Sequence, residues 1–472
     1  MRRSVLPFLA ASAVGLCLAS PAFAQDGAIS AEEAAAMRAQ ISALKAQIQL
    51  MEQKLDTAIG APQRTAPQPA PEPVPTATIA AVAPPKAPPT TEIAWKGSPQ
   101  FTSSGGRSFK AKGRIQADVG YVARPDGLTD RGLGYATEMR RIRLGGEGGL
   151  GAGIGYKLEL ELSDNSVDLV DTFVTYKNGG WLLSVGNQNQ FQSLDELTGD
   201  TSGSVMERAA FTDAFNFERR LGVAAQYEKA AWLLQAGLFA DDITALSNDS
   251  DGEDGGDENN SYGLDGRVVY APKLGDIQWH LGGSAHWRDL KRVGDAGTRY
   301  RQRPFVHTSN TRLIGTSTLD VTDEAHYGLE AAFVRGRLHG AAETHWLRSD
   351  IATGPDAEFF GGYAELGWFL TDDTRGYKSG IFDRAKPRKP LGGGGLGAVQ
   401  VNARYDYLDL NSGAIVGGRQ DAWIAALIWQ PVEYLRFNVN YAYLLYQDAT
   451  PLADGDQNYG VHVTGARMEL DF

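Results

Sequence analysis

Polar and apolar residues alternate along most of the chain from about residue 108 onward. From Phe109 to Tyr121 the odd-numbered positions are apolar or small, and the even-numbered ones are Lys, Lys, Arg, Gln, Asp and Gly. Successive side chains of a β-strand point to opposite faces of its sheet. The pattern therefore predicts a strand with one apolar face and one charged face along this whole stretch.

The same alternation returns in Tyr156–Leu162 and in Ala466–Phe472. The first stretch exceeds the ~5–6 residues usual for a strand in a globular protein, and it is long enough to supply the ~9–11 residues that cross a bilayer with tilt. A β-sandwich and a soluble barrel also alternate, and both are alternatives. Strand length, a secretory leader and the terminal Phe472 together favour a membrane barrel.

The connections between the expected strands are of two kinds. Lys177-Asn178-Gly179-Gly180 has the composition of a tight hairpin turn, whereas residues 248–262 are long and polar. At roughly 20–25 residues per strand with its connection, residues 105–472 would form about 16 antiparallel strands, an even number as in bacterial barrels. A ring of that width is not filled by its own side chains and would hold water.

The first 24 residues have the features of a secretory signal peptide. Arg2 and Arg3 precede a short apolar run, and Ala22-Phe23-Ala24 is a small-x-small cleavage site. A lipoprotein signal around Cys17 is the alternative, but Leu16 stands where a small residue is needed. Cys17 is the only cysteine, so the mature chain would have neither a disulfide nor a cysteine metal site.

Residues 25–60 predict a helix. Ser30 and Glu33 form a capping box at its start. Apolar residues then recur at alternating spacings of four and three, as in the a and d positions of a coiled coil: Met37, Ile41, Leu44, Ile48, Met51 and Leu55. Self-association is favoured, and a single amphipathic helix packed on the barrel is the alternative.

Residues 61–104 are expected to form an extended linker, because ten of the 21 prolines fall between Pro62 and Pro89. The predicted architecture is thus a signal peptide (1–24), a helical coiled-coil segment (25–60), this linker and an all-β transmembrane barrel of about 16 antiparallel strands (105–472). Helix and linker are expected in the periplasm.

The ordered motifs of the barrel region resemble the phosphate-selective porin family of the O and P type. The first group comprises Gly113–Asp118, Arg140–Gly145, Asp171–Val174, Leu194–Thr198, Met206–Arg208 and Arg219–Gly222. The second comprises Phe369–Thr371, Arg375–Tyr377, Phe382–Arg384, Lys386-Pro387, Gly397-Ala398, Ala403–Tyr405 and Leu408–Leu410. The resemblance implies a 16-stranded homotrimer in the bacterial outer membrane, with basic residues lining an anion path. It also implies that Leu194–Arg208 belongs to a constriction loop folded into the pore, and that Phe472 is read by the barrel-insertion machinery.

A pore selects ions by the charges at its narrowest part, and arginine forks match phosphate oxygens. Basic residues on the charged strand faces and beside the constriction loop are therefore the candidates for the anion path: Lys110, Lys112, Arg114, Arg141, Arg143, Arg208, Arg219, Arg220, Arg267 and Arg404. The alternative is that these residues only solvate the lumen or pair with acidic neighbours. The function expected is passive diffusion of small anions, phosphate or polyphosphate among them.

Acidic residues leave other functions open. The chain carries 57 Asp and Glu against 45 Lys and Arg, a net charge of −12, which argues against a nucleic-acid partner. Residues 191–217 hold five carboxylates and Arg208 alone, as in a less selective pore for small polar solutes. A barrel-anchored envelope tether and an esterase using His307 and Ser309 are the remaining alternatives. Outer-membrane lipid and small anions are the expected partners, and no enzyme activity, cofactor or metal is expected.

Overall fold

The computed structural model describes residue 45 and residues 90–163, 166–240, 242–243, 261–290 and 297–472. The predicted signal peptide, nearly all of the predicted coiled coil and most of the predicted linker lie outside these residues. Among the described residues, no helix is long and apolar enough to span a membrane.

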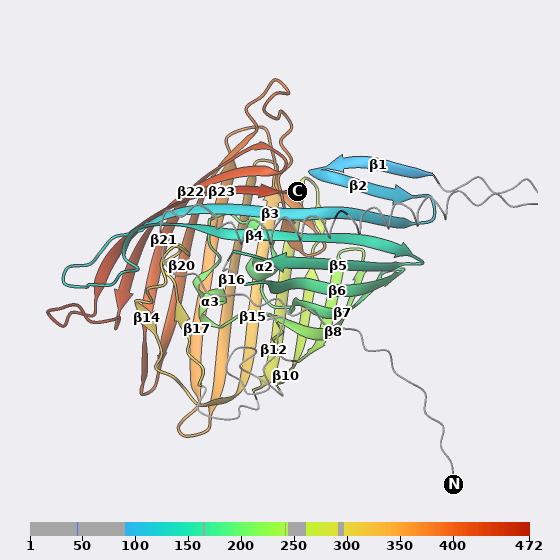
Figure 1. Cartoon of the computed structure of the whole chain (residues 1–472). Coiled ribbons are helices and arrows are strands. Elements are labelled where there is room, and N and C mark those ends of the chain that lie inside the picture. The colour runs from blue at the N-terminus through green and yellow to red at the C-terminus, as the bar shows by residue number, and fades with distance from the viewer. Residues whose placement is uncertain (1–44, 46–89, 164–165, 241, 244–260, 291–296) are drawn as a thin grey trace, which may run out of the picture. The chain divides into compact units, whose positions relative to one another are not determined.

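Sixteen of the described strands form one closed antiparallel barrel (Figure 1). Each pairs with the next along the chain, and the last pairs with the first, so that Arg467 lies opposite Asp118. The strands of the first half are β3 (Arg107–Val122), β4 (Gly134–Gly151), β5 (Ile154–Glu161), β6 (Asp168–Asn178), β7 (Trp181–Asn189), β8 (Arg219–Lys229), β9 (Trp232–Phe239) and β10 (Tyr262–Tyr270). Those of the second half are β12 (Ile277–Asp289), β15 (Val321–Arg335), β16 (Leu338–Ile351), β17 (Ala357–Phe369), β20 (Ala398–Ser412), β21 (Ile415–Val432), β22 (Leu435–Gln447) and β23 (Tyr459–Asp471).

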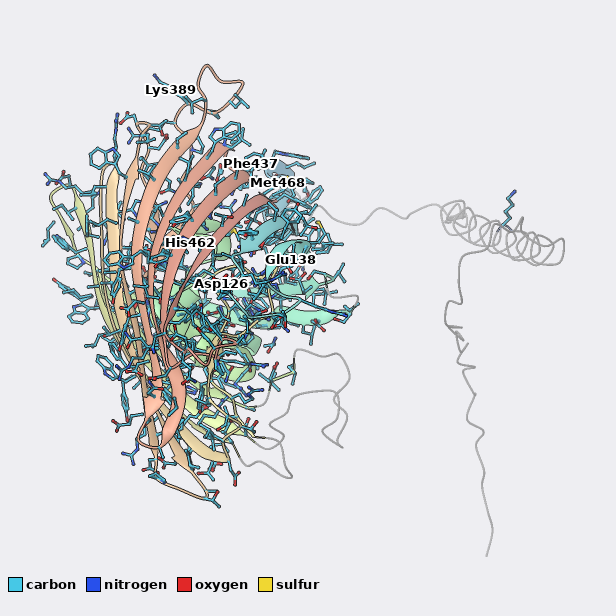
Figure 2. The ribbon with its side chains drawn as sticks, turned by 90° about the vertical axis from the view of Figure 1, so that its left-hand side faces the viewer. Asp126, Glu138, Lys389, Phe437, His462 and Met468 are labelled. Atoms are coloured by element: carbon cyan, nitrogen blue, oxygen red, sulfur yellow. The ribbon has the colours of Figure 1, made fainter. Side chains whose placement is uncertain are left out.

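The two faces of this barrel are inverted relative to a water-soluble protein. On β23 the charged Arg467 and Glu469 point inward and are 3% and 2% exposed, whereas Met468 points outward and is 38% exposed. Met468 lies beside Phe437 of β22 on the same outer face (Figure 2). An apolar outside and a polar inside are what a membrane barrel requires, and the period-two prediction for these strands is confirmed.

Short turns gather at one end of the barrel, as the hairpin at Gly179-Gly180 illustrates. Gly179 has φ 58°, a backbone conformation that glycine adopts without steric cost and that a two-residue hairpin turn requires. One connection at this short-turn end is long, residues 370–397, with the small strands β18 (Gly376–Lys378) and β19 (Ile381–Asp383). The strand β11 (Lys273–Leu274) lies in another turn at this end.

Residues 91–103 differ from the extended linker expected there. They form a hairpin of β1 (Thr91–Lys96) and β2 (Ser98–Ser103), and β2 pairs with the start of β3. Gly97 supplies the turn with φ 80°. Ile93, Phe101 and Phe109 are paired neighbours on one face, so the alternation that marks strands had already begun inside the segment that the prolines assigned to the linker.

Three connections fold into the barrel. The inward loop (residues 190–218) carries α2 (Leu194–Leu197), the 3-10 helix η1 (Asp200–Ser202) and α3 (Ala210–Ala214). Loop 297–320 carries β13 (Arg301–Gln302) and β14 (Ile314–Gly315). Segment 370–397 enters from the short-turn end, where Arg375 Nη2 donates to the Ser202 carbonyl of the inward loop at 2.8 Å. The lumen is therefore narrowed from both ends.

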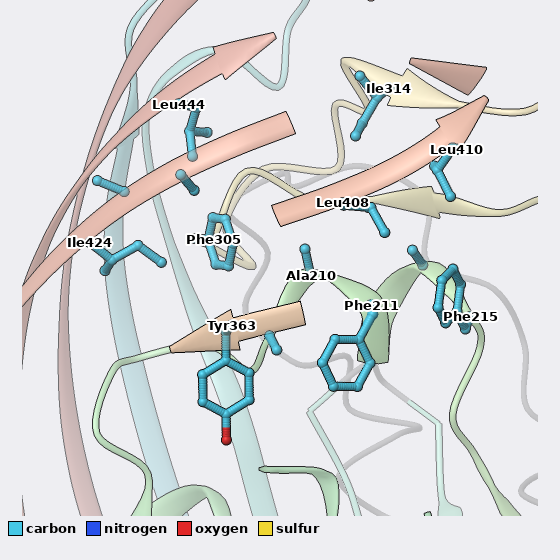
Figure 3. Close-up of a cluster of buried hydrophobic side chains, with 14 of the residues drawn as sticks. Ala210, Phe211, Phe215, Phe305, Ile314, Tyr363, Leu408, Leu410, Ile424 and Leu444 are labelled. Carbon is cyan, nitrogen blue, oxygen red and sulfur yellow. The ribbon is translucent and has the colours of Figure 1, made fainter. Parts of the chain in front are cut away.

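The buried apolar cluster lies inside the barrel wall, where these loops meet the strands (Figure 3). Phe211 and Phe215 of α3 and Phe305 of loop 297–320 face Tyr363 and Leu408 on β17 and β20. Burying such side chains contributes roughly 1.5–3 kcal/mol each. Apolar packing thus fixes the loops that narrow the lumen.

Candidate functional site: the charged constriction

A cavity of about 260 Å³ lies between the inward loop, loop 297–320 and the walls β4, β20 and β23. Its charged lining combines seven arginines with five carboxylates, an excess of two positive charges among the described residues. The arginines are Arg140, Arg141, Arg208, Arg219, Arg303, Arg404 and Arg467. The carboxylates, Asp195, Glu196, Asp200, Glu207 and Asp213, all come from the inward loop.

A β-bulge places two consecutive arginines at this cavity. Gln116 of β3 pairs with Arg141, whereas its neighbour Ala117 pairs with Met139, so Arg140 is the extra residue. A bulge sets two residues of one strand against one of its partner and re-aims side chains. Arg140 and Arg141 therefore both line the cavity, and the Nε atoms of both have no hydrogen-bond partner among the described residues.

Asp200 of the inward loop joins two wall arginines. Arg114 donates to its carboxylate at 2.8 Å, and Arg141 donates to the other oxygen. Burial alone would raise the pKa of Asp200, but Arg141 and Arg114 hold it well below its usual value. The carboxylate is therefore ionised at neutral pH and competes with any anion for these two guanidinium groups.

Arg404 of β20 is the most enclosed of the lining cations, with a side chain 1% exposed. It donates to both oxygens of Asp195 at 3.1 Å and to Glu365 at 2.7 Å, and its guanidinium lies 4.2 Å from the Tyr363 ring centroid. With two carboxylates and an aromatic face as partners, Arg404 anchors the inward loop to the wall.

Arg467 makes a similar contact on β23, three strands away from β20 along the wall. It donates to both oxygens of Asp118 at 2.7 Å and also to Glu207. Burial alone would raise the pKa of Glu207, but Arg467 and Arg140 hold it at about 2. The loop carboxylates thus lie between wall arginines. In this arrangement a wall arginine can exchange a loop carboxylate for another anion.

A family model described as phosphate-selective porin O and P matches residues 109–472, most of the chain and nearly all of this barrel. The chain belongs to the phosphate-selective porin O and P family. It is accordingly an outer-membrane porin, and the barrel forms the channel.

Other known proteins are similar to this porin. An uncharacterized protein of Caulobacter vibrioides is 68% identical over 468 residues, covering 98% of this chain and 94% of that protein. Porin O of Pseudomonas aeruginosa is 28% identical over 351 residues, covering 66% and 74%. OmpT of Vibrio cholerae, an outer membrane protein solved after in-vitro folding, has a TM-score of 0.51 at 12% identity, covering 78% and 98%. Its trimer form has a TM-score of 0.50, also at 12% identity, covering 78% and 100%. These structures share the fold of this porin.

The porin brings four of the ten predicted residues to the cavity: Arg141, Arg208, Arg219 and Arg404. Arg208 lies 3.5 Å from Glu196, and Arg219 donates to Asp171 at 2.7 Å. Each of the four therefore has a carboxylate partner, which agrees in part with the alternative that such residues pair with acidic neighbours.

The other six predicted residues lie outside this cavity. Arg114 reaches it only through Asp200, Arg143 donates to Glu161 at 2.7 Å, and Arg267 donates to Glu330 at 2.6 Å near segment 370–397. The remaining ones are Arg220, which pairs with Glu218 at 3.3 Å, Lys112, which pairs with Glu147 at 3.3 Å, and Lys110, which lines a separate cavity of about 320 Å³ beside the β1–β2 hairpin.

Sequence reasoning missed Arg140, Arg303 and Arg467. Arg140 had a signal, because apolar residues 139 and 142 are three apart where strict alternation would give two. Arg467 had been placed on the polar face but was not selected. Arg303 belongs to a stretch with no periodic pattern, so nothing in the sequence indicated that it folds inward.

His307 and Ser309 do not form the arrangement that an esterase needs. His307 Nδ1 lies 3.0 Å from Glu138 of β4. Ser309 is fully buried, and its hydroxyl accepts from the Thr311 amide. His307 instead lines the charged cavity.

Proposed function

We propose that this porin passes small anions, phosphate among them, in preference to cations. The observation that carries the proposal is the concentration of arginines that line the constriction, seven against five lining carboxylates. Three of the seven, Arg219, Arg404 and Arg467, also pair with wall carboxylates, so the arginines available to an anion are chiefly Arg140, Arg141, Arg208 and Arg303. Fixed positive charge at a narrow point lowers the barrier for anions and raises it for cations.

The pairing of these arginines suggests how an anion moves. A guanidinium has five N–H donors, and Arg141 offers one of them to Asp200 of the inward loop. A passing phosphate would bind Arg141 in place of Asp200, and Asp200 would return when the anion leaves. Reversible exchange gives binding that is favourable enough for entry and weak enough for exit.

The test is the reversal potential of the purified protein in planar bilayers under a salt gradient. Anion preference is expected in the native pore, and Arg140→Glu with Arg141→Glu should reduce or invert it. Arg348→Glu is the matched control, because Arg348 is 53% exposed and outside the cavity. Cation preference of the native pore would contradict the proposal, and competition by added phosphate would show whether phosphate binds there.

A less selective pore is the second candidate. Its specific support is that all five cavity carboxylates come from the inward loop, whereas Arg140, Arg141, Arg404 and Arg467 belong to the wall. Such a transverse separation of charge orients dipolar solutes. Near-equal permeability to anions and cations, together with uptake of zwitterions, would favour this candidate.

We propose that the protein is a homotrimer with its long loops outside the cell and its N-terminal helix and linker in the periplasm. The trimer form of the Vibrio cholerae barrel supports this assembly by analogy of fold. Native mass measurement in detergent tests the subunit number. Protease added to intact cells tests the orientation, because it should cut the long loops and leave the linker whole.

We also propose that Phe472 is read by the barrel-insertion machinery. Phe472 exchanges backbone hydrogen bonds of 3.0 and 2.9 Å with Gly113 at the barrel seam. Deleting Phe472 should lower the amount of barrel in the outer membrane while refolding in detergent continues. An equal loss of folded barrel in the outer membrane and in detergent would mean that Phe472 acts by stabilising the barrel.

A further inference from the structure

All seven histidines of the chain are described, and five of them are fully buried: His280, His286, His326, His339 and His345. These five lie on the inward faces of β12, β15 and β16. His280 and His339 meet segment 370–397, through the Tyr377 hydroxyl at 2.6 Å and the Arg375 guanidinium at 3.3 Å. The other three meet the inward loop, and we call them the histidine trio.

The trio forms a row across three neighbouring strands. Ring centroids lie 5.1 Å apart for His286 and His326, and 5.6 Å apart for His326 and His345. At the start of the inward loop, the Gln190 amide nitrogen lies 3.4 Å from His286 Nδ1.

Three phenylalanines of the inward loop cover this row. Phe211 is stacked on His345 at 5.3 Å with an angle of 3° between the rings, and Phe217 meets the same imidazole edge-on at 4.9 Å. Phe215 lies 6.3 Å from His326. Figure 3 shows Phe211 and Phe215 in the apolar cluster that binds α3 to the wall. The attachment of α3 therefore depends on imidazoles that pack as apolar rings.

A protonated imidazole in this row would find few hydrogen-bond acceptors for its N–H groups. His345 Nε2 and His326 Nδ1 are buried without a hydrogen-bond partner among the described residues. Burying a charge without such a partner is costly. Neighbouring imidazolium ions about 5–6 Å apart would also repel each other in a medium of low dielectric constant.

Acidic groups near the trio are already engaged. His286 bonds Asp265 of β10, and Glu324 receives Arg288 at 2.6 Å and the Tyr300 hydroxyl at 2.5 Å. His326 lies 3.6 Å from Glu324. On the short-turn side of His345, Glu330 is paired with Arg267, and Glu343 accepts two backbone amides of α2. On α3 itself, Asp213 binds Arg303. Among the described residues, no carboxylate forms a hydrogen bond or an ion pair with His345.

We propose that the histidine trio is a proton-operated anchor of the inward loop. At neutral pH the uncharged rings hold Phe211, Phe215 and Phe217 against the wall and keep the channel open. Proton uptake from water makes that contact unfavourable, α3 leaves the wall, and the loop closes the constriction. This mechanism would regulate the opening of the porin channel, and it does not depend on which ion the channel prefers.

The experiment is single-channel recording between about pH 8 and pH 4, a range extended to the acid side of ordinary histidine titration because charging these buried rings is costly. The native protein should show a rise of about tenfold in closed time across this range, a typical size for coupling between two sites. His345→Phe and His326→Phe keep the aromatic packing but take up no proton, so each should shift or abolish the closure. Asp200 and Glu207 remain ionised throughout, because their pKa values lie far below this range.

Three controls separate the trio from other groups. His462→Phe changes an outward-facing histidine, and His307→Gln changes the one that lines the cavity; both should close as the native protein does. Glu196→Gln controls for the loop carboxylate whose pKa burial raises. A native channel that stays open in acid, or His345→Phe and His326→Phe variants that close at the native pH, would overturn the proposal. If a variant does not insert, hydrogen exchange of residues 210–217 in the native protein gives the second readout, and unchanged protection on acidification would equally overturn it.

Discussion

At the residue scale, many charged side chains inside the barrel form buried ion pairs. Arg267 has no exposed side-chain surface, and its guanidinium binds Glu330 twice, Gln235, and the Gly380 carbonyl. Removing one member of such a pair costs more than the pair contributes, because the other charge is left buried. The anion-path residues predicted from charge alone therefore divide into structural pairs and exchangeable ones, and sequence gave no way to tell them apart.

Asp200→Asn should increase anion preference. The substitution removes the carboxylate that Arg114 and Arg141 share and leaves two positive charges available to a passing anion. The reversal potential should move further in the anion direction. Asp276→Asn, at an exposed pair with Arg335, should leave it unchanged, and a shift toward cations in Asp200→Asn would show that this pair does not take part in permeation.

Arg267→Ala should lower the stability of the barrel by about 3–5 kcal/mol, since Glu330 then lies buried without its main partner. The matched control is Arg335→Ala, which breaks a surface pair exposed by 60% and 70% and should leave the stability almost unchanged, because solvent screens such a pair. Thermal unfolding in detergent, followed by gel mobility, measures both. Equal losses would mean that the Arg267 pair is not energetically distinct.

At the element scale, wall carboxylates hold the inward loop. Glu343 of β16 accepts the Leu194 and Asp195 amides at the start of α2, at 2.8 and 2.7 Å, and Asp406 of β20 accepts the Ala210 amide at the start of α3 at 3.2 Å. The first amides of a helix have no partner within the helix, so these carboxylates satisfy them. Glu343 and Asp406 lie on the inward faces of their alternating strands, but nothing local in the sequence indicates that a distant loop lies opposite them.

Glu343→Ala should loosen the inward loop without unfolding the barrel. It removes the acceptor for two amides and for the Tyr363 hydroxyl, while Arg404 still binds Asp195. Faster hydrogen exchange at residues 194–197 and a noisier open-channel current are expected. Glu358→Ala, at an exposed position near the far end of β17, is the control, and equal protection in both variants would contradict the anchoring role.

At the scale of the whole molecule, the sequence predicted the architecture well and its interior poorly. The number of strands followed from the length of chain per strand, the hairpin at Gly179-Gly180 from its turn residues, and the inverted faces from period two, all of which are local features. The inward path of loop 297–320 and the entry of segment 370–397 depend on contacts between residues far apart in the chain. Tyr446, near the end of β22, is 2% exposed and faces inward, so proximity to a strand end does not decide which face an aromatic side chain occupies.

Gly113→Val should impair closure of the barrel. Gly113 lies under the Phe472 ring, and even a Cβ there would stand 2.2 Å from the ring carbon Cζ. A branched side chain would displace the ring where the first and last strands meet. Less folded, heat-shifted protein in the membrane fraction is expected, whereas Gly266→Val in β10, where an added Cβ meets no atom within 4 Å, tests for a general glycine effect. Normal yields of Gly113→Val would show that the seam tolerates a displaced terminus.

Because segment 370–397 enters from the short-turn end, part of the lumen is narrowed by residues that do not belong to the long loops. Contacts such as Arg375 with Ser204 and Glu365 lie deep in the barrel. In the proposed orientation, with the long loops outside the cell, changes at the tips of those loops would leave these contacts as they are.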